Sequence, residues 1–163
     1  MATTDGNVAT ETDWSAYSSQ SLFLDANALV HSTISASPFH LVARDTLDAL
    51  RAAGAKLQVS LQILREYISA TTKPPLAKKP PDRAPVIANV RQFLTDFTVL
   101  ADGLPVVDKL LDLLATIPCG GKQVHDANIV ATMLVHGVPN LLTHNVADFK
   151  RFGHLINIIP LVP

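Results

Sequence analysis

Apolar positions along the chain follow two periods, one typical of strands and one typical of helices. Short apolar or alternating runs, which predict strands, lie at residues 22–24, 56–60, 97–100, 139–143 and 155–159. Longer stretches with apolar residues at helical spacing predict helices that begin near residues 28, 38, 61, 82, 105, 124 and 146. Strands that alternate with helices in this way favour an α/β domain built on a parallel sheet.

Local preferences add detail to several of these helices. Asn27 is expected to cap a helix that starts at Ala28, and Ser60 is expected to cap the helix that carries Glu66. The helix that begins at residue 105 has valine or leucine at residues 106, 107, 110, 111, 113 and 114. With so many apolar positions, this helix is predicted to be mostly buried.

The chain of 163 residues is 48% hydrophobic, which suits one domain with a substantial core. Residues 1–20 contain no Lys or Arg and lack the features of a secretion signal, so a flexible tail is expected before a domain at 21–163. Trp14 and Tyr17 could instead dock on the domain or on a partner. No run approaches the roughly 18 apolar residues of a membrane span. The single cysteine, Cys119, excludes an internal disulfide, so a cytoplasmic location is expected.

A loop rich in proline and in basic residues is predicted at residues 71–85. Its five prolines remove backbone donors and fix φ, so an extended surface excursion is expected. A linker between two domains is the competing interpretation, but the flanking segments are too short to fold separately. Although the net charge is −1, the loop carries basic side chains that could contact a phosphate backbone: Lys73, Lys78, Lys79 and Arg83. Alternatively, they only keep the loop solvated.

Four carboxylates occupy positions where a parallel α/β domain places its chemistry. Asp25 directly follows a predicted strand, Glu66 and Asp126 lie on predicted helices, and Asp148 follows the fourth predicted strand by five residues. Ligands of open parallel sheets bind beyond the carboxyl ends of the strands, where clustered acids would repel one another without a cation. Oxygen-only clusters suit Mg²⁺ or Mn²⁺, and these metals suit phosphate chemistry. Glu66 could also be an ordinary exposed helix residue.

Two of the acids have structural interpretations as well. Asp126 shares a helix face with Ile129, so it must be paired, bound to a metal or stabilised by the helix N-terminus. Asn145 could cap a short helix, with Asp148 three residues later. The side chain of each residue would then accept a hydrogen bond from the backbone N–H of the other, as in a capping box. Thr143 and Asn145 also lie at a strand end, where they could bind a phosphate oxygen or a metal-bound water. The two interpretations are compatible.

Four short motifs occur in a defined order along the chain, at residues 24–30 (LDANALV), 62–67 (QILREY), 125–131 (HDANIVA) and 142–149 (LTHNVADF). Together with a closing apolar segment at 156–160, they resemble the PIN-domain nucleases and, more narrowly, the VapC-type toxins of toxin–antitoxin pairs. The resemblance covers residues 21–160. It implies a PIN-like three-layer fold, in which helices flank a central parallel sheet.

The resemblance also implies a role for each of these polar residues. Asp25, Glu66, Asp126 and Asp148 correspond to catalytic, metal-binding carboxylates, and Asn27, Thr143 and Asn145 to supporting polar groups. The implied activity is that of a Mg²⁺- or Mn²⁺-dependent ribonuclease with RNA as its substrate. Such toxins are frequently homodimers, and a small antitoxin protein silences them by binding near the active site.

Two other classes of function compete with this one. A PIN-like module without catalysis could bind RNA or protein, but such modules commonly lose one or more acids, and all four are present here. Another metal-dependent phosphate hydrolase is the second alternative. Phosphatases with an aspartate nucleophile need a second aspartate two residues after the first, and Asn27 holds that position.

Overall fold

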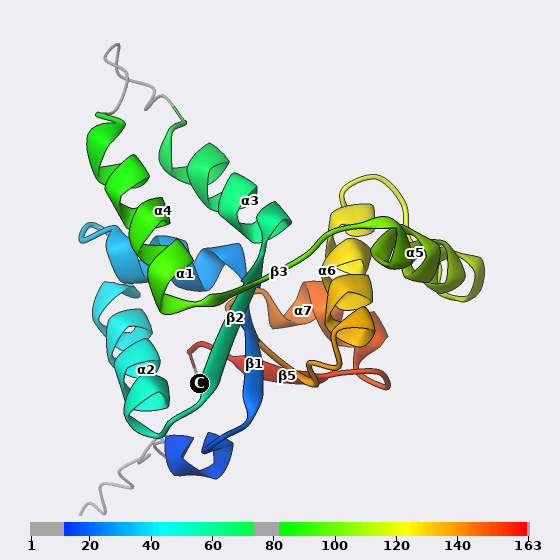
Figure 1. The fold of residues 1–163 in the computed structure, drawn as a ribbon, viewed down its shortest axis with the longest axis horizontal. Helices are drawn as coiled ribbons and strands as arrows, with labels where there is room; N and C mark the ends of the chain where they lie inside the picture. The colour runs from blue at the N-terminus through cyan, green and yellow to red at the C-terminus, as the bar shows by residue number, and fades with distance from the viewer. Residues whose placement is uncertain (1–11, 74–81, 163) are drawn as a thin grey trace, which may run out of the picture.

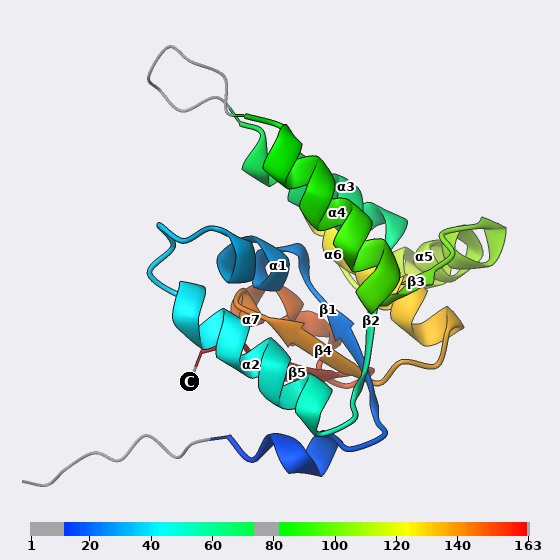
Figure 2. The same ribbon diagram turned by 60° about the vertical axis from the view of Figure 1, so that its left-hand side comes forward.

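Five parallel strands form a sheet at the centre of the molecule. The computed structural model describes residues 12–73 and 82–162. The strands are β1 (Ser21–Leu24), β2 (Lys56–Ser60), β3 (Thr98–Leu100), β4 (Asn140–Thr143) and β5 (Asn157–Pro160), in the order β3-β2-β1-β4-β5. Figure 1 labels all of them except β4, which is labelled in Figure 2. Every pairing between them is parallel. The predicted α/β class with a parallel sheet is therefore confirmed.

The central strand, β1, consists of a short run in which three consecutive residues are apolar. It pairs with β2, placing Leu22 opposite Leu57, and with β4, placing Leu24 opposite Leu142. Leu22, Phe23 and Leu24 are all fully buried. Parallel strands covered on both faces have no polar side, so they lack the alternation of a half-exposed strand. This packing fixes the point at which the chain leaves β1 at the carboxyl edge of the sheet.

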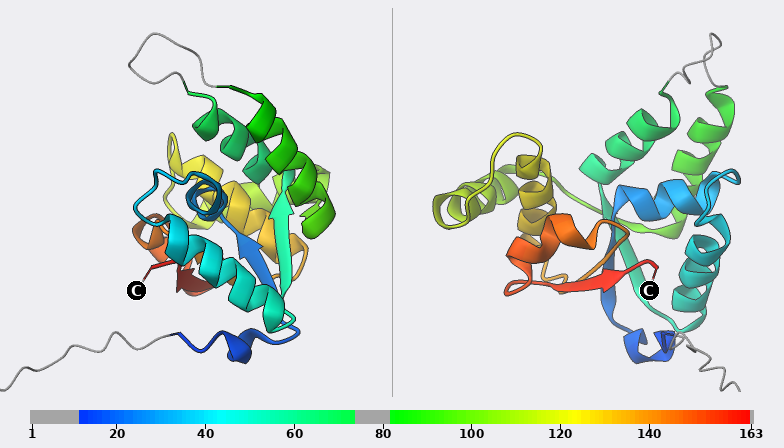
Figure 3. Two further views of the ribbon diagram at one scale, coloured as in Figure 1. Left: turned by 90° about the vertical axis from the view of Figure 1, so that its left-hand side faces the viewer. Right: turned by 180° about the vertical axis from the view of Figure 1, so that it is seen from behind.

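Helices lie on both faces of the sheet and give the molecule three layers (Figures 1 and 3). One face is covered by α1 (Ala26–Thr33) and α2 (His40–Ala52), and the other by α6 (Gln123–Val135) and α7 (Val146–Phe149), with α5 (Leu104–Thr116) packed on the outside of α6. α3 (Leu61–Thr71) and α4 (Ala84–Asp96) run side by side past the carboxyl ends of the strands (Figure 2). Within residues 12–73 and 82–162, no helix is long and apolar enough to cross a membrane.

The first helix begins earlier than the sequence predicted. α1 starts at Ala26, and its N-cap is Asp25, whose carboxylate accepts a hydrogen bond from Ala26 N at 2.6 Å. Asn27, the expected cap, lies within the first turn. Asp25 has an extended backbone, with φ −74° and ψ 154°, so the chain passes from strand to helix through this one residue. No separate turn is left in which Asn27 could act as the cap.

The prediction that α5 is mostly buried is wrong. Only Val106 and Leu113 are buried on this helix, whereas Leu104 is 79% exposed and Leu111 is 60% exposed. α5 packs mainly against α6 and lies away from the sheet (Figure 1). It therefore buries one stripe, which Leu110 and Leu114 extend as partly buried side chains, whereas Leu104, Val107 and Leu111 are exposed.

The described part of the N-terminal segment docks on the domain. Residues Trp14–Tyr17 form a 3-10 helix, η1, whose Asp13 cap accepts a hydrogen bond from Ser15 N. Trp14 and Tyr17 are partly buried and pack against the hydrophobic core. These two aromatic residues therefore dock on the domain, which was the alternative to a loose tail. Residues 1–11 of the predicted tail lie outside the described residues.

The helices on either side of the predicted loop at 71–85 extend into it. α4 includes Pro85 in its first turn, where the missing N–H of a proline would have no helical partner. Among the basic residues predicted for this loop, Lys73 and Arg83 are exposed, and Lys78 and Lys79 lie outside the described residues.

Tyr67 in α3 is a buried polar link between three helices. Its fully buried hydroxyl lies 3.1 Å from Thr33 Oγ1 of α1 and accepts a hydrogen bond from Asn89 Nδ2 of α4 at 2.9 Å. Tyr67→Phe is expected to lower the free energy of unfolding by about 1–2 kcal/mol, because it leaves buried polar groups unpaired. Urea denaturation measures the loss. Tyr17→Phe, at the edge of the core, is the control and should change stability by less than about 0.5 kcal/mol. Equal stability of Tyr67→Phe and the wild type would contradict the prediction.

Candidate active site

The strand order of the sheet places a crevice at the carboxyl ends of β1 and β4. The chain proceeds from β1 outward to β2 and β3, then returns to the other side of β1 for β4 and β5. Loops after β1 and β4 therefore diverge, and open α/β sheets bind ligands at such a point. Asp25 follows β1 and Thr143 ends β4, so both lie at this crevice.

Asp25 is the most constrained of the four predicted acids. The residue is 6% exposed, and its Oδ2 accepts hydrogen bonds from Thr143 Oγ1 and Asn27 Nδ2, both at 2.7 Å. Burial raises the pKa of the Asp25 carboxyl above its ordinary value. The hydrogen bonds from Thr143, Ala26 and Asn27 oppose this rise in pKa, and the charge of Glu66 adds to it. Asp25 is thus a buried carboxylate whose orientation is fixed by its neighbours.

Asn27 and Thr143 join the two loops of the crevice. Asn27 Oδ1 accepts a hydrogen bond from His144 N at 2.9 Å, and Asn27 Nδ2 lies 3.2 Å from Thr143 Oγ1. Thr143 Oγ1 also accepts a hydrogen bond from Asn145 N at 3.0 Å. The three predicted supporting residues therefore lie together around Asp25, and the Asn145 backbone is part of the network.

The capping interpretation of Asn145 is wrong in one respect. Asn145 is the N-cap residue of α7, but its side chain makes no capping hydrogen bond. Asp148 N bonds to the Asn145 backbone carbonyl at 3.1 Å, so the turn is closed by the main chain alone. Both side chains are exposed, and Asn145 lines a hollow of about 270 Å³ together with Asp25 and Glu66.

Asp126 lies in the first turn of α6, half-buried, and its pKa is raised from 3.8 to about 6. Burial is the largest cause of the higher pKa, followed by the charges of Asp148, Asp25 and Glu66. Arg151 offsets part of this effect. Three of the predicted acids, which come from different segments of the chain, thus lie near enough to act electrostatically on the fourth.

A cleft of about 730 Å³ opens beside these acids, between α3 and the α5–α6 pair. Glu66 and Asp126 line it, and so do the basic residues Arg65 and Lys122. Arg65 forms an ion pair with Asp102 at 3.5 Å. Neither basic residue was identified from the sequence, because each is isolated in it and lies outside the basic loop.

The donor atoms of the site fit a hard divalent cation, since all four acids offer oxygen. A cation would also offset the buried charge of Asp25 and the repulsion at Asp126. Yet across residues 12–73 and 82–162, no three His, Cys, Asp or Glu side chains are grouped closely enough to hold a metal ion. Hydrogen bonds fix Asp25, whereas Asp148 is exposed and Asp126 is half-buried. Metal binding would therefore require the less constrained carboxylates to rotate toward Asp25.

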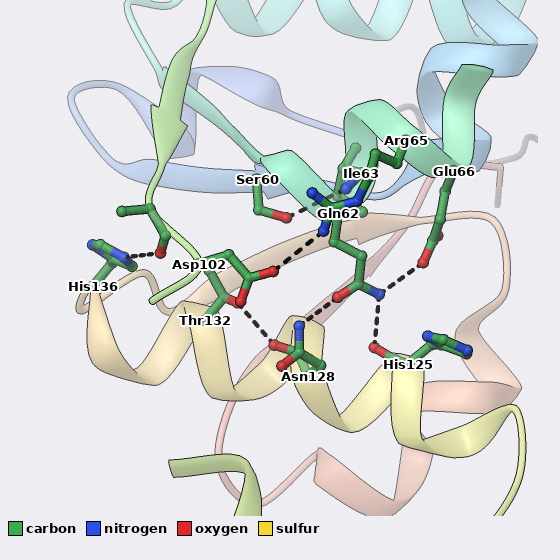
Figure 4. Close-up of polar contacts among 11 residues, drawn as sticks. Ser60, Gln62, Ile63, Arg65, Glu66, Asp102, His125, Asn128, Thr132 and His136 are labelled. Atoms are coloured by element: carbon green, nitrogen blue, oxygen red, sulfur yellow. Dashed lines mark hydrogen bonds and ion pairs between the residues drawn. The ribbon is translucent and has the colours of Figure 1, made fainter. Parts of the chain in front are cut away.

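Sequence reasoning missed two amides that join the acidic segments. Gln62 in α3 donates a hydrogen bond to Glu66 Oε1 at 2.7 Å, and Asn128 in α6 donates one to Gln62 Oε1 at 2.6 Å (Figure 4). A signal for Gln62 was present, because it interrupts an apolar stretch four residues before Glu66. The link to Asn128 depends on how α3 packs near α6, which the local pattern does not contain.

The comparison with known sequences identifies the family. The sequence model of the PIN domain matches residues 22–155. The chain therefore belongs to the PIN domain family. Ribonuclease VapC48 of Mycobacterium tuberculosis is 29% identical to the chain over 133 residues, which cover 78% of this chain and 89% of VapC48.

Solved structures agree with the three-layer fold. The toxin–antitoxin complex from Klebsiella pneumoniae contains a chain with a TM-score of 0.59 and 19% identity, matched over 86% of this chain and 98% of that chain. VapC20 of Mycobacterium tuberculosis, a toxin that cleaves the sarcin–ricin loop, has a TM-score of 0.61 and 14% identity, matched over 83% of this chain and 95% of that chain. The predicted PIN-like fold, with a central parallel sheet flanked by helices, is confirmed.

Proposed function

We propose that the protein is a Mg²⁺- or Mn²⁺-dependent endoribonuclease and the toxin of a toxin–antitoxin pair. The observation that carries this proposal is the grouping of the acids: Glu66 lines one hollow with Asp25 and the larger cleft with Asp126. The charges of Asp148, Asp25 and Glu66 also help to raise the pKa of Asp126. Membership of the PIN domain family and the similarity to ribonuclease VapC48 support it. VapC20, which cleaves the sarcin–ricin loop, supports RNA as the class of substrate.

The four acids would hold the cation, and Asn27, Thr143 and Asn145 would keep the site in shape. When bound, the cation would supply the Lewis acidity that phosphodiester hydrolysis requires. Thr143 and Asn27 hold the Asp25 carboxylate at one orientation through their hydrogen bonds. Asp126 holds a proton on its carboxyl below about pH 6 and must release it before it can act as a ligand.

RNA would enter along the cleft between α3 and the α5–α6 pair. Arg65 and Lys122 line this cleft beside Glu66 and Asp126, so they would contact phosphates next to the acids. The basic residues predicted to contact RNA from the sequence remain proposed contacts for more distant phosphates: Lys73, Lys78, Lys79 and Arg83. Cationic side chains at these positions would raise the affinity for RNA in a salt-dependent manner.

We further propose an antitoxin partner, a homodimer and a cytoplasmic location. The similarity to a chain of the toxin–antitoxin complex from Klebsiella pneumoniae supports an antitoxin partner. Exposed apolar side chains on α5, including Leu104 and Leu111, offer a surface suited to protein contacts. Light scattering coupled to size-exclusion chromatography tests the dimer, and a monomer at micromolar concentration would contradict it.

RNA cleavage by the purified protein tests the proposed activity. With Mn²⁺ or Mg²⁺, the protein is expected to cut total RNA into defined fragments, and EDTA is expected to stop the reaction. A phosphomonoester substrate should remain intact. Hydrolysis of the phosphomonoester without RNA cleavage would indicate a phosphatase. Inactivity toward both substrates would favour a binding module, and either result would contradict the proposed function.

A further inference from the structure

Gln62 occupies a buried position between the two helices that carry Glu66 and Asp126. It lies in α3, one turn before Glu66, and is 7% exposed. Its side chain extends from α3 toward α6 and ends between Glu66, His125 and Asn128 (Figure 4). A buried glutamine must satisfy both amide hydrogens and its oxygen, so its contacts determine its orientation.

All three hydrogen-bonding groups of the Gln62 side chain are used. Nε2 donates to Glu66 Oε1 at 2.7 Å and to the His125 backbone carbonyl at 3.0 Å. Oε1 accepts a hydrogen bond from Asn128 Nδ2 at 2.6 Å. If the amide were reversed, its oxygen would face the two acceptors and its nitrogen would face the Asn128 donor. The Asn128 donor and the His125 carbonyl therefore select the orientation in which Gln62 donates to Glu66.

The same contacts tie together two segments that the site needs at a fixed separation. His125 directly precedes Asp126, and Asn128 follows it by two residues. Gln62 therefore joins the first turn of α6 to the helix that carries Glu66. Movement of α3 relative to α6 would break these hydrogen bonds and would change the separation of Glu66 from Asp126.

We propose that Gln62, oriented by Asn128, is a positioning residue that holds the Glu66 carboxylate and sets its separation from Asp126. The inference rests on the proposed function, because it gives Glu66 a part in metal-dependent cleavage. Gln62 itself contacts neither the scissile bond nor the cation. Its effect reaches the reaction through Glu66, in the manner of groups that orient metal-binding carboxylates from outside the ligand set.

Gln62→Met tests the inference, because methionine is of similar length and has no amide. We expect the Kd for Mn²⁺ to rise by about 10- to 100-fold and kcat for RNA cleavage to fall by a similar factor. KM for RNA should change by less than about threefold, since the RNA-binding surface is intact. Calorimetric titration measures Mn²⁺ affinity without any need for turnover, and circular dichroism confirms that the variant is folded.

A matched control exists on α4. Gln92 donates to Asp96 Oδ1 at 2.7 Å with the same four-residue spacing, but this pair is exposed and lies outside the cleft. Gln92→Met should leave Mn²⁺ affinity and kcat at wild-type values. If both glutamine variants were equally impaired, the effect would reflect a general loss of helix contacts, which would overturn the inference.

A double-mutant cycle tests whether Asn128 acts through Gln62. Asn128→Ala should weaken Mn²⁺ binding in the same direction but less than Gln62→Met, and the double variant should be no worse than Gln62→Met alone. Additive losses would overturn the proposed order of action. If Gln62→Met lowered only the Tm and left Mn²⁺ affinity and kcat unchanged, Gln62 would have a structural role. That result would overturn this inference and leave the proposed function standing. A wild-type protein that neither binds Mn²⁺ nor cleaves RNA would overturn the proposed function and this inference together.

Discussion

Asp25→Asn is expected to reduce RNA cleavage by at least about 10³-fold. Asp25 is the acid with the most fixed position, held by Thr143 and Asn27 at 2.7 Å each. The substitution removes one negative charge from the group that would bind the cation, and no other acid is buried at the end of β1. Because cation binding is lost, added Mn²⁺ should not restore activity. The rate of cleavage of total RNA by equal amounts of folded protein measures the effect.

The fold is expected to survive this substitution. Asp25 caps α1 through a bond from Ala26 N, and asparagine is as effective an N-cap as aspartate. Replacing the buried carboxylate by a neutral amide also removes the free-energy cost of keeping a charge away from water. Circular dichroism should therefore resemble that of the wild type, and the Tm should fall only modestly, because the new amide nitrogen replaces the oxygen that accepts from Asn27 and Thr143. Asp45→Asn, on the exposed surface of α2, is the control and should cleave RNA normally. Wild-type cleavage by Asp25→Asn would contradict the assignment of Asp25.

The position of Asp25 and Thr143 at one edge of the sheet could be anticipated from local sequence patterns. Each follows or ends a short apolar run, and short fully apolar runs separated by helices predict parallel strands. Parallel strands place their carboxyl ends at one edge of the sheet, and the pairing of β1 with β4 then brings residues 118 positions apart in sequence within 2.7 Å of each other. The strand positions predicted the shared edge, whereas the adjacency of β1 and β4 could not be read from the local pattern.

Other features depended on packing that the local pattern does not record. The leucines and valines of α5 predicted burial, but the number of apolar residues cannot tell whether a helix packs on the sheet or on one neighbouring helix. Similarly, Asn27 was a reasonable cap by residue preference, yet Asp25 takes that role because strand and helix are directly joined. The Gln62–Asn128 hydrogen bond links residues 66 positions apart and required the docking of two helices.

Asp126→Asn is expected to stabilise the metal-free protein while abolishing its stabilisation by Mn²⁺. The folded-state pKa of Asp126 is about 6, compared with 3.8 ordinarily, so the folded state binds the proton more tightly than the unfolded state does. Stability from this group is therefore full below about pH 4 and is lost as pH rises through about 6. The asparagine side chain cannot ionise, so the variant keeps this stability as the pH rises. At pH 7.5 we expect a gain of about 1 kcal/mol, discounted from the full pKa difference because Asp126 is half-exposed.

Mn²⁺ is expected to reverse the order of stability. A ligand that binds only the folded state at 100 times its Kd stabilises that state by about 2.7 kcal/mol, so the wild-type Tm should rise by roughly 5–11 °C. Asp126→Asn should show little of this rise, because one carboxylate that would bind the cation is gone. Thermal melting with and without Mn²⁺, at pH 5 and at pH 7.5, measures both effects. The wild-type response should shrink at pH 5, where protons compete with the cation for Asp126. If the variant were less stable than the wild type without metal, or equally stabilised by Mn²⁺, Asp126 would be an ordinary helix N-terminal acid and no part of a cation site.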